Sequence, residues 1–126
     1  MTDKNIPRFV IPERAVSKFV QLYIDGEAYL RHDSYYTDHS LILEETLKEF
    51  GLRNYVVFVE DGRVDIKGER YEAVGMGFLV KSFENDMKYN LSDISYHHGI
   101  GPNQKHLDDL TPYLPEGIKL TIREKR

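Results

Sequence analysis

The sequence predicts a single α+β domain over residues 1–126, with two N-terminal helices on a mainly antiparallel sheet of four to five strands and a short helix before the last strand. Three observations lead to this fold class: apolar residues at helical spacing near the N-terminus, a second amphipathic segment with good capping residues, and period-two alternation afterwards. Helices followed by a run of strands are typical of a two-layer fold with the helices on one face. The 126 residues are the usual length of one domain, and no repeat or linker divides them.

Residues 1–10 are expected to be extended, because a residue before proline avoids the helical region. The segment from residue 12 to residue 32 allows two interpretations. Gly26 is placed to end a helix. Five apolar residues before it fall at i, i+3, i+4, i+7 and i+8: Val16, Phe19, Val20, Tyr23 and Ile24. The alternative is a hairpin of Phe19–Ile24 with Glu27–His32, joined by Asp25-Gly26, the strongest short hairpin signal. Because strict alternation is poor in Phe19–Ile24, we favour the helix.

The second helix begins at Thr37 or Asp38, either of which can act as N-cap, and runs to about Phe50. Its inward positions are Ile42 or Leu43, Leu47 and Phe50, and Gly51 is the C-terminal stop.

Three strands follow in the prediction. Residues 54–59 read as a strand buried on both faces, residues 60–63 as a hairpin turn, and Val64 and Ile66 as the apolar positions of the return strand. A turn at Gly68-Glu69 leads into a long strand, Arg70–Lys81. Gly75 and Gly77 share one face of that strand, which favours a bulge, a bend or the close approach of another element.

The C-terminal third contains fewer signals. Ser82–Asn90 is polar and predicts a loop, and a short strand is expected around Asp93–His97. Asn103 can cap a short helix that holds Leu107 and Leu110. Residues 118–123 alternate apolar and polar side chains, which predicts the final strand.

Composition excludes several classes of function. The chain has 17 Lys and Arg against 21 Asp and Glu, a net charge of −4, which makes nucleic acid an improbable partner. Cysteine is absent, so disulfides, thiolate nucleophiles and cysteine-based metal sites are excluded. No apolar run is long enough to span a membrane, and no export signal is visible, so we expect no membrane partner and a cytoplasmic location.

The most concentrated chemistry lies between residues 96 and 106, where three of the five histidines occur. His97, His98 and His106 are candidate ligands or proton carriers, and Lys105 is placed to steady an anion. His98, His106 and Asp109 form the candidate metal set, because neutral imidazoles and carboxylates bind divalent ions. The competing interpretation is ordinary loop and cap histidines, since no known metal-binding spacing is present.

A second polar cluster runs from His32 to His39 and contains Tyr35 and Tyr36. Its histidines would join the first cluster only if the fold brought the two loops together. Its Asp and Thr residues are otherwise explained as turn and cap residues.

The sequence therefore favours a small non-enzymatic binding or regulatory protein that acts through protein–protein contacts, without a cofactor. Tyr35, Tyr36 and Tyr96 are the candidate partner-binding residues, since tyrosine combines an apolar body with a polar tip. Self-association through the strand at Ile118–Arg123 belongs to this interpretation. The alternative is a metal-assisted or His-dependent hydrolase, of phosphodiesterase or nuclease type, using a divalent metal and the region around His97, His98 and His106.

Overall fold

The structure, a computed structural model, describes residues 6–52, 57–60, 63–84, 87–92 and 100–123, with the side chains of 57–60 and 63–65 left aside. It begins with a β-hairpin rather than a helix. Strands β1 (Val16–Ile24) and β2 (Glu27–Ser34) pair antiparallel along their length. Asp25 and Gly26 join them with positive φ angles of 53° and 81°, as a two-residue primed turn requires. The predicted first helix is therefore wrong, and the Asp25-Gly26 signal was the better guide.

Burial on both faces of β1 explains this error. Phe19, Val20, Gln21 and Leu22 are consecutive, and none of them is exposed. When a strand is covered on both sides, the alternation of apolar and polar residues that marks a half-buried strand disappears. The apolar spacing that remained resembled a helix by coincidence.

Helix α1 (His39–Glu49) confirms the second predicted helix. Ile42, Leu43 and Leu47 are its buried apolar residues, and Gly51 follows it with a φ of 73°. Asp38 occupies the N-cap position, although its side chain makes no capping hydrogen bond.

The remaining elements agree in part with the prediction. They are β3 (Val57–Glu60), β4 (Arg63–Lys67), β5 (Tyr71–Lys81), β6 (Lys88–Ser92), α2 (Gln104–Leu110), the 3₁₀ turn η1 (Thr111–Tyr113) and β7 (Lys119–Ile122). The hairpin β3–β4, the long strand β5, the short helix α2 and the last strand are confirmed. Strand β6 lies within a segment predicted as loop, whereas the strand predicted at residues 93–97 lies outside the described residues.

The sheet places β5 at its centre. The strand order is β2-β1-β5-β4-β3, and β6 pairs with β5 and with β7. Strand β4 pairs with the first part of β5, and strand β6 pairs with the last part of β5. The sheet therefore continues from this edge of β5 as two separate branches, β4–β3 and β6–β7. All described pairings are antiparallel except β6–β7, which is parallel.

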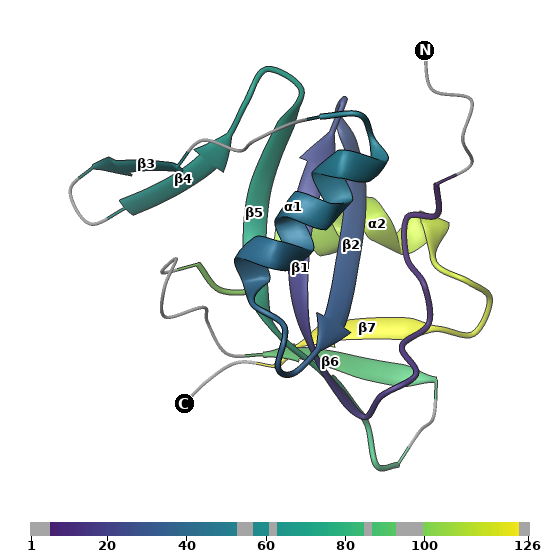
Figure 1. Ribbon diagram of the computed structural model, residues 1–126. Coiled ribbons are helices and arrows are strands. Elements are labelled where there is room, and N and C mark those ends of the chain that lie inside the picture. Colours follow the sequence, from purple (N-terminus) through teal and green to yellow (C-terminus); the bar gives the residue numbers. More distant parts are fainter. Residues whose placement is uncertain (1–5, 53–56, 61–62, 85–86, 93–99, 124–126) are drawn as a thin grey trace.

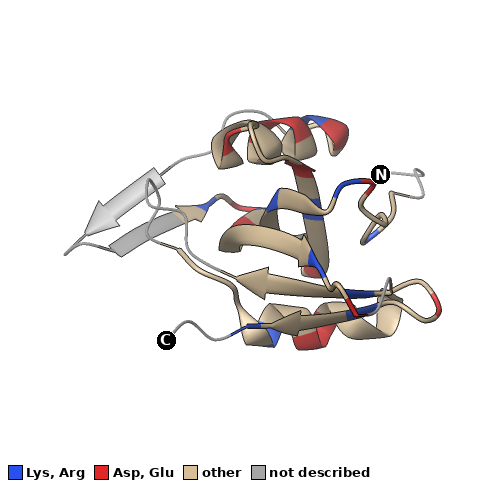
Figure 2. Ribbon diagram, turned by 90° about the horizontal axis from the view of Figure 1, so that it is seen from below, with Lys and Arg blue, Asp and Glu red and all other residues tan. Residues whose placement is uncertain are grey.

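The predicted fold class is thus corrected in its arrangement. Strands come first, one helix rather than two precedes the other strands, and the described residues form seven strands. The two helices lie on opposite sides of the sheet, so the helices do not share one face (Figures 1 and 2). Neither helix in the described part of the chain is long and apolar enough to cross a membrane.

Each helix covers a separate apolar core. The core under α1 consists of Val20, Leu22, Ile24, Tyr29, Ile42, Leu43, Leu47, Ile66, Tyr71, Ala73 and Met76. The core under α2 consists of Phe9, Phe19, Ala28, Leu30, Leu79, Tyr89, Leu91, Leu107, Leu110, Ile118 and Leu120. Phe9 belongs to the N-terminal segment, whose Arg8 carbonyl accepts a hydrogen bond of 3.0 Å from Leu30 N at the edge of β2.

Candidate interaction surface

Two of the three predicted contact tyrosines lie exposed in the connection between β2 and α1. Tyr35 is 50% exposed and Tyr36 is 90% exposed. Their rings meet edge to face, with centroids 5.5 Å apart. A turn holds this connection, because Ser34 Oγ accepts from Tyr36 N at 3.2 Å and Ser34 O accepts from Thr37 N at 2.9 Å. Tyr96, the third predicted residue, lies outside the described residues.

Tyr35 is fixed against the sheet by Phe78 of β5. The two rings stack with centroids 5.5 Å apart and an interplanar angle of 24°. Lys18 Nζ lies 5.7 Å from the centre of the Tyr35 ring, within the range of a cation–π contact. Tyr35, Tyr36 and Phe78 are called the aromatic cluster below.

His39, the last residue of the second predicted polar cluster, contacts both the aromatic cluster and the backbone of β5. It is buried, its ring packs edge-on against Phe78 with centroids 6.3 Å apart, and its Nε2 donates to Gly77 O at 2.9 Å. The start of α1 is thereby attached to the middle of β5.

Beyond the start of α1, one face of the sheet carries no described helix. The registers place Val16 beside Val80, Val80 beside Asn90, and Asn90 beside Thr121 on this face. The residues with the opposite orientation, such as Leu79 and Leu91, are buried in the core under α2. We call the following half-buried or exposed residues the open face: Val16, Lys18, Phe78, Val80, Lys88, Asn90, Ser92, Lys119, Thr121 and Arg123.

The open face is basic although the chain is acidic overall. It contains four cationic side chains, and Asp33 of β2, opposite Lys18, is the one acidic neighbour in the strand register. Within the described part of the chain none of the four cations forms an ion pair. Lys88 and Lys119 are directly paired across β6 and β7. The four cations are Lys18, Lys88, Lys119 and Arg123.

Exposed apolar side chains gather at the same end of the molecule. The end is defined by the start of β1, the end of β2, the end of β5 and the start of β6, which the registers bring together. Eight of the nine large hydrophobic side chains that are exposed in the described residues lie there, and Tyr113 is the exception. We call these eight the apolar end: Val10, Ile11, Val16, Tyr35, Tyr36, Leu41, Phe83 and Met87.

The predicted catalytic residues are not gathered into a site among the described residues. His97 and His98 lie outside the described residues. His106 is fully buried: its Nε2 donates to Leu22 O at 2.9 Å, and its Nδ1 accepts from Gln21 Nε2 at 3.2 Å. Both ring nitrogens are therefore used within the core, and burial lowers the pKa of this imidazole below its ordinary value.

Gln21 is the residue that links His106 to the rest of the fold. Its Nε2 also donates to Asn103 O at 2.9 Å, and its Oε1 accepts from Asn103 N at 2.8 Å. The side chain crosses directly over Gly75, where a Cβ atom would lie 2.1 Å from Gln21 Oε1. The glycine predicted to mark a close approach is thus required by this glutamine, beside a bulge of the β1–β5 register.

Lys105 and Asp109 lie on the outer side of α2. Lys105 Nζ and Asp109 Oδ2 are 3.0 Å apart, and Tyr23 Oη donates to the same carboxylate oxygen at 2.5 Å. The hydrogen bonds from Tyr23 and Lys105 lower the pKa of Asp109. Asp109 and His106 belong to the same helix, whereas His98, the third member of the candidate metal set, lies outside the described residues. No group of three or more potential ligands occurs within the described residues.

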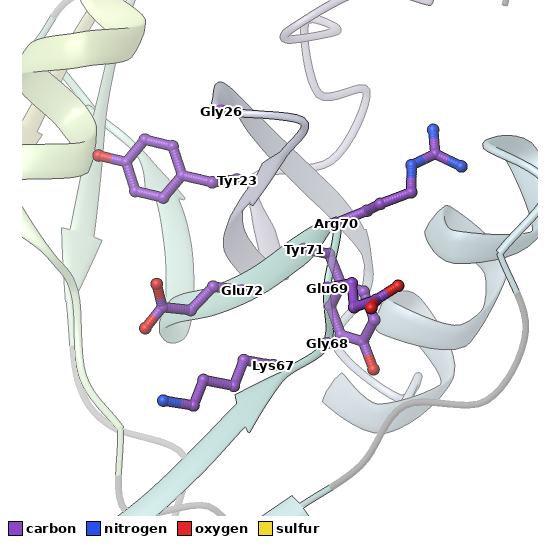
Figure 3. A pocket seen from close by; sticks show the side chains of 8 residues that line it. All are labelled: Tyr23, Gly26, Lys67, Gly68, Glu69, Arg70, Tyr71 and Glu72. Carbon is purple, nitrogen blue, oxygen red and sulfur yellow. The ribbon is translucent and has the colours of Figure 1, made fainter. Parts of the chain in front are cut away.

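A shallow pocket of about 350 Å³, lined in part by Tyr23, lies at the end of β4 and the start of β5. Its charged side chains do not converge: Lys67 and Glu72 point to one side and Arg70 to the other (Figure 3). Arg70 is already held by both carboxylate oxygens of Asp25, each at 2.8 Å.

His32, the first residue of the second polar cluster, is also used structurally. Its Nε2 donates to Val10 O at 2.6 Å, and burial lowers its pKa. Phe78 and Lys18 were missed in the sequence analysis, since only the strand register brings them to Tyr35.

Comparison with known proteins adds no relative: no protein family matches the chain, and no curated protein matches it either.

Proposed function

We propose that this chain is a non-enzymatic binding protein that acts through protein–protein contacts made by the apolar end and the adjoining open face. The observation that carries the proposal is the concentration of exposed apolar side chains at one end of the fold. A contiguous exposed apolar surface with polar and charged neighbours is typical of an interaction site. Exposed aromatic rings held in place by packing are the side chains that most often dominate binding energy.

The chemistry of the described histidines agrees with this function. His32, His39 and His106 each use ring nitrogens to hold the backbone of another segment. The hydrolase alternative then depends on His97 and His98, which lie outside the described residues. We include a cytoplasmic location and the absence of a cofactor in the same proposal. The chain has no cysteine, so it offers no thiolate ligand to a metal cofactor.

The test is quantitative capture by immobilised protein. The double variant Tyr36→Ser and Phe83→Ser removes two exposed rings without touching either core, and Tyr113→Ser removes an exposed ring outside the apolar end. We expect a partner that binds the native chain saturably to lose at least about tenfold in affinity for the double variant and to keep its affinity for the control. Equal binding to all three proteins would contradict the proposal.

A further inference from the structure

We propose that the partner on the open face is a second copy of this chain, whose helix α1 fills the part of the sheet that the first copy's α1 leaves uncovered. This inference rests on the proposed function, because it identifies the occupant of the same surface. The interface is isologous: each copy contributes one helix and one open face.

The first argument is the shape of the α1 layer. Helix α1 packs on Val20, Leu22 and Met76 but begins at His39, which is bonded to Gly77 O. The same face of the sheet continues past that point through the open face, and in the view of Figure 1 strands β6 and β7 lie below the helix. A two-fold axis at this boundary lets the two helices lie side by side, each on the other copy's open face. The layer of helices is then complete in both copies.

The second argument is charge complementarity. The exposed stripe of α1 consists of Leu41, Glu44, Glu45 and Lys48, at i, i+3, i+4 and i+7. Glu44 forms no ion pair with described residues, and Glu45 has only a loose contact of 3.8 Å with Lys48. Acidic residues are conspicuous along α1 in Figure 2. An acidic helix ridge with one apolar residue matches a basic sheet face with an aromatic cluster beside it.

The same charges argue against other occupants. A nucleic acid on the open face would bring its phosphates close to the glutamates of α1, in a chain of net charge −4. Pairing of β7 with its own copy around Thr121 would place Lys119 opposite Arg123, and like charges directly opposite each other are unfavourable.

The area that the proposed dimer must bury is modest. A stable dimer needs about 800 Å² from each copy, which is about a tenth of the 8226 Å² surface of the chain.

The experiment measures the mass of the full chain by sedimentation equilibrium over a range of concentrations. We expect a concentration-dependent shift from 14.8 kDa to twice that mass. Two charge-reversed proteins then locate the interface: one carries Glu44→Lys and Glu45→Lys, and the other carries Lys88→Glu and Lys119→Glu. Each alone should have a dimer Kd raised about tenfold or more, because its helix and open face now carry like charges.

Mixing the two charge-reversed proteins restores both contacts at once, so we expect a heterodimer with a Kd close to that of the native dimer. A control with Glu69→Lys and Glu72→Lys makes the same change in net charge as Glu44→Lys with Glu45→Lys, at exposed positions by the turn between β4 and β5, and it should leave the dimer intact. A native chain that stays monomeric at millimolar concentration would overturn this inference. A dimer that ignores both reversals, or a monomer that binds an acidic peptide or an oligonucleotide through Lys88 and Lys119, would overturn it too. Loss of dimerisation with partner capture retained would leave the proposed function standing.

Discussion

Replacing Gly75 by alanine should destabilise the fold through one specific collision. The new methyl group would lie 2.1 Å from Oε1 and 2.9 Å from Cδ of Gln21, so the amide of Gln21 must move. That amide makes three hydrogen bonds, two with the backbone of Asn103 and one with His106. The substitution thus acts through a buried polar network rather than through the backbone of β5.

The expected magnitude follows from these three bonds. Each contributes a net stabilisation of about 0.5–1.5 kcal/mol, so their loss should lower the free energy of unfolding by about 2–4 kcal/mol. In a Gln21→Ala background the nearest remaining atom is Asn103 N, at 3.2 Å from the methyl group. There we expect Gly75→Ala to change the free energy of unfolding by less than about 0.5 kcal/mol, since alanine also reduces the entropy of the unfolded chain. The two substitutions should therefore be strongly non-additive.

Equilibrium unfolding in urea, followed by far-ultraviolet circular dichroism, measures this cycle with four proteins: native, each single variant and the double variant. The double variant should be about as stable as Gln21→Ala alone. Additivity of the two single effects within about 0.5 kcal/mol would refute the claim that Gln21 requires a glycine at position 75.

Three further predictions concern stability. Gly26→Ala should lower the free energy of unfolding by about 1–2 kcal/mol, measured in urea, and Gly26→Asn by less, because φ is +81° and nothing lies within 4 Å. Leu43→Ala, in the core under α1, should lower it by about 2–5 kcal/mol, and a cost below about 1 kcal/mol would contradict its full burial. Burial lowers the folded-state pKa of His106 and His32, so their contribution to stability should be fully present above the unfolded-state pKa of about 6.5. It should be lost as the pH falls below that value, by at most about 1.4 kcal/mol per pH unit for each histidine. His106→Gln should flatten that slope in pH-dependent unfolding, and an unchanged slope would contradict the neutral state of His106.

Much of the local structure could be predicted from the sequence because its signals are local. Helix α1 has its apolar stripe and terminal Gly51 within a single segment, and Asn103 accepts the capping bond of α2 from His106 N at 2.9 Å. Strand β5 is long and flanked by a turn at Gly68, whose N–H donates to Tyr71 O. No distant residue was needed to recognise these elements.

The hairpin β1–β2 and strand β6 depend on contacts that are remote in sequence. Strand β1 lacks alternation because two cores cover its two faces, one closed by helix α1 and the other by residues as far along the chain as Leu107 and Leu120. Strand β6 is short and is completed by parallel pairing with β7, about thirty residues further on. Local patterns do not contain that information.

The sequence points to only part of the candidate surface. Tyr35 and Tyr36 were chosen as contact residues from their residue type, and that role stays a prediction. The Phe78 ring that stacks on Tyr35 lies in another strand, which no local pattern indicates. His106 was selected for reactivity, and its role is instead decided by Gln21, which precedes it by 85 residues. A sequence shows that an imidazole is present, whereas only the fold shows whether its nitrogens are already used.

The most direct test of the interaction surface is site-specific photocross-linking in cells that express the full chain. A photoreactive phenylalanine analogue replaces Tyr36 in one protein and Tyr113 in another, and mass spectrometry identifies the adducts. We predict one discrete protein adduct, a second copy of the chain or another protein, from position 36 and none of comparable yield from position 113. Equal or absent cross-linking at the two positions would contradict the assignment of the apolar end as a contact surface.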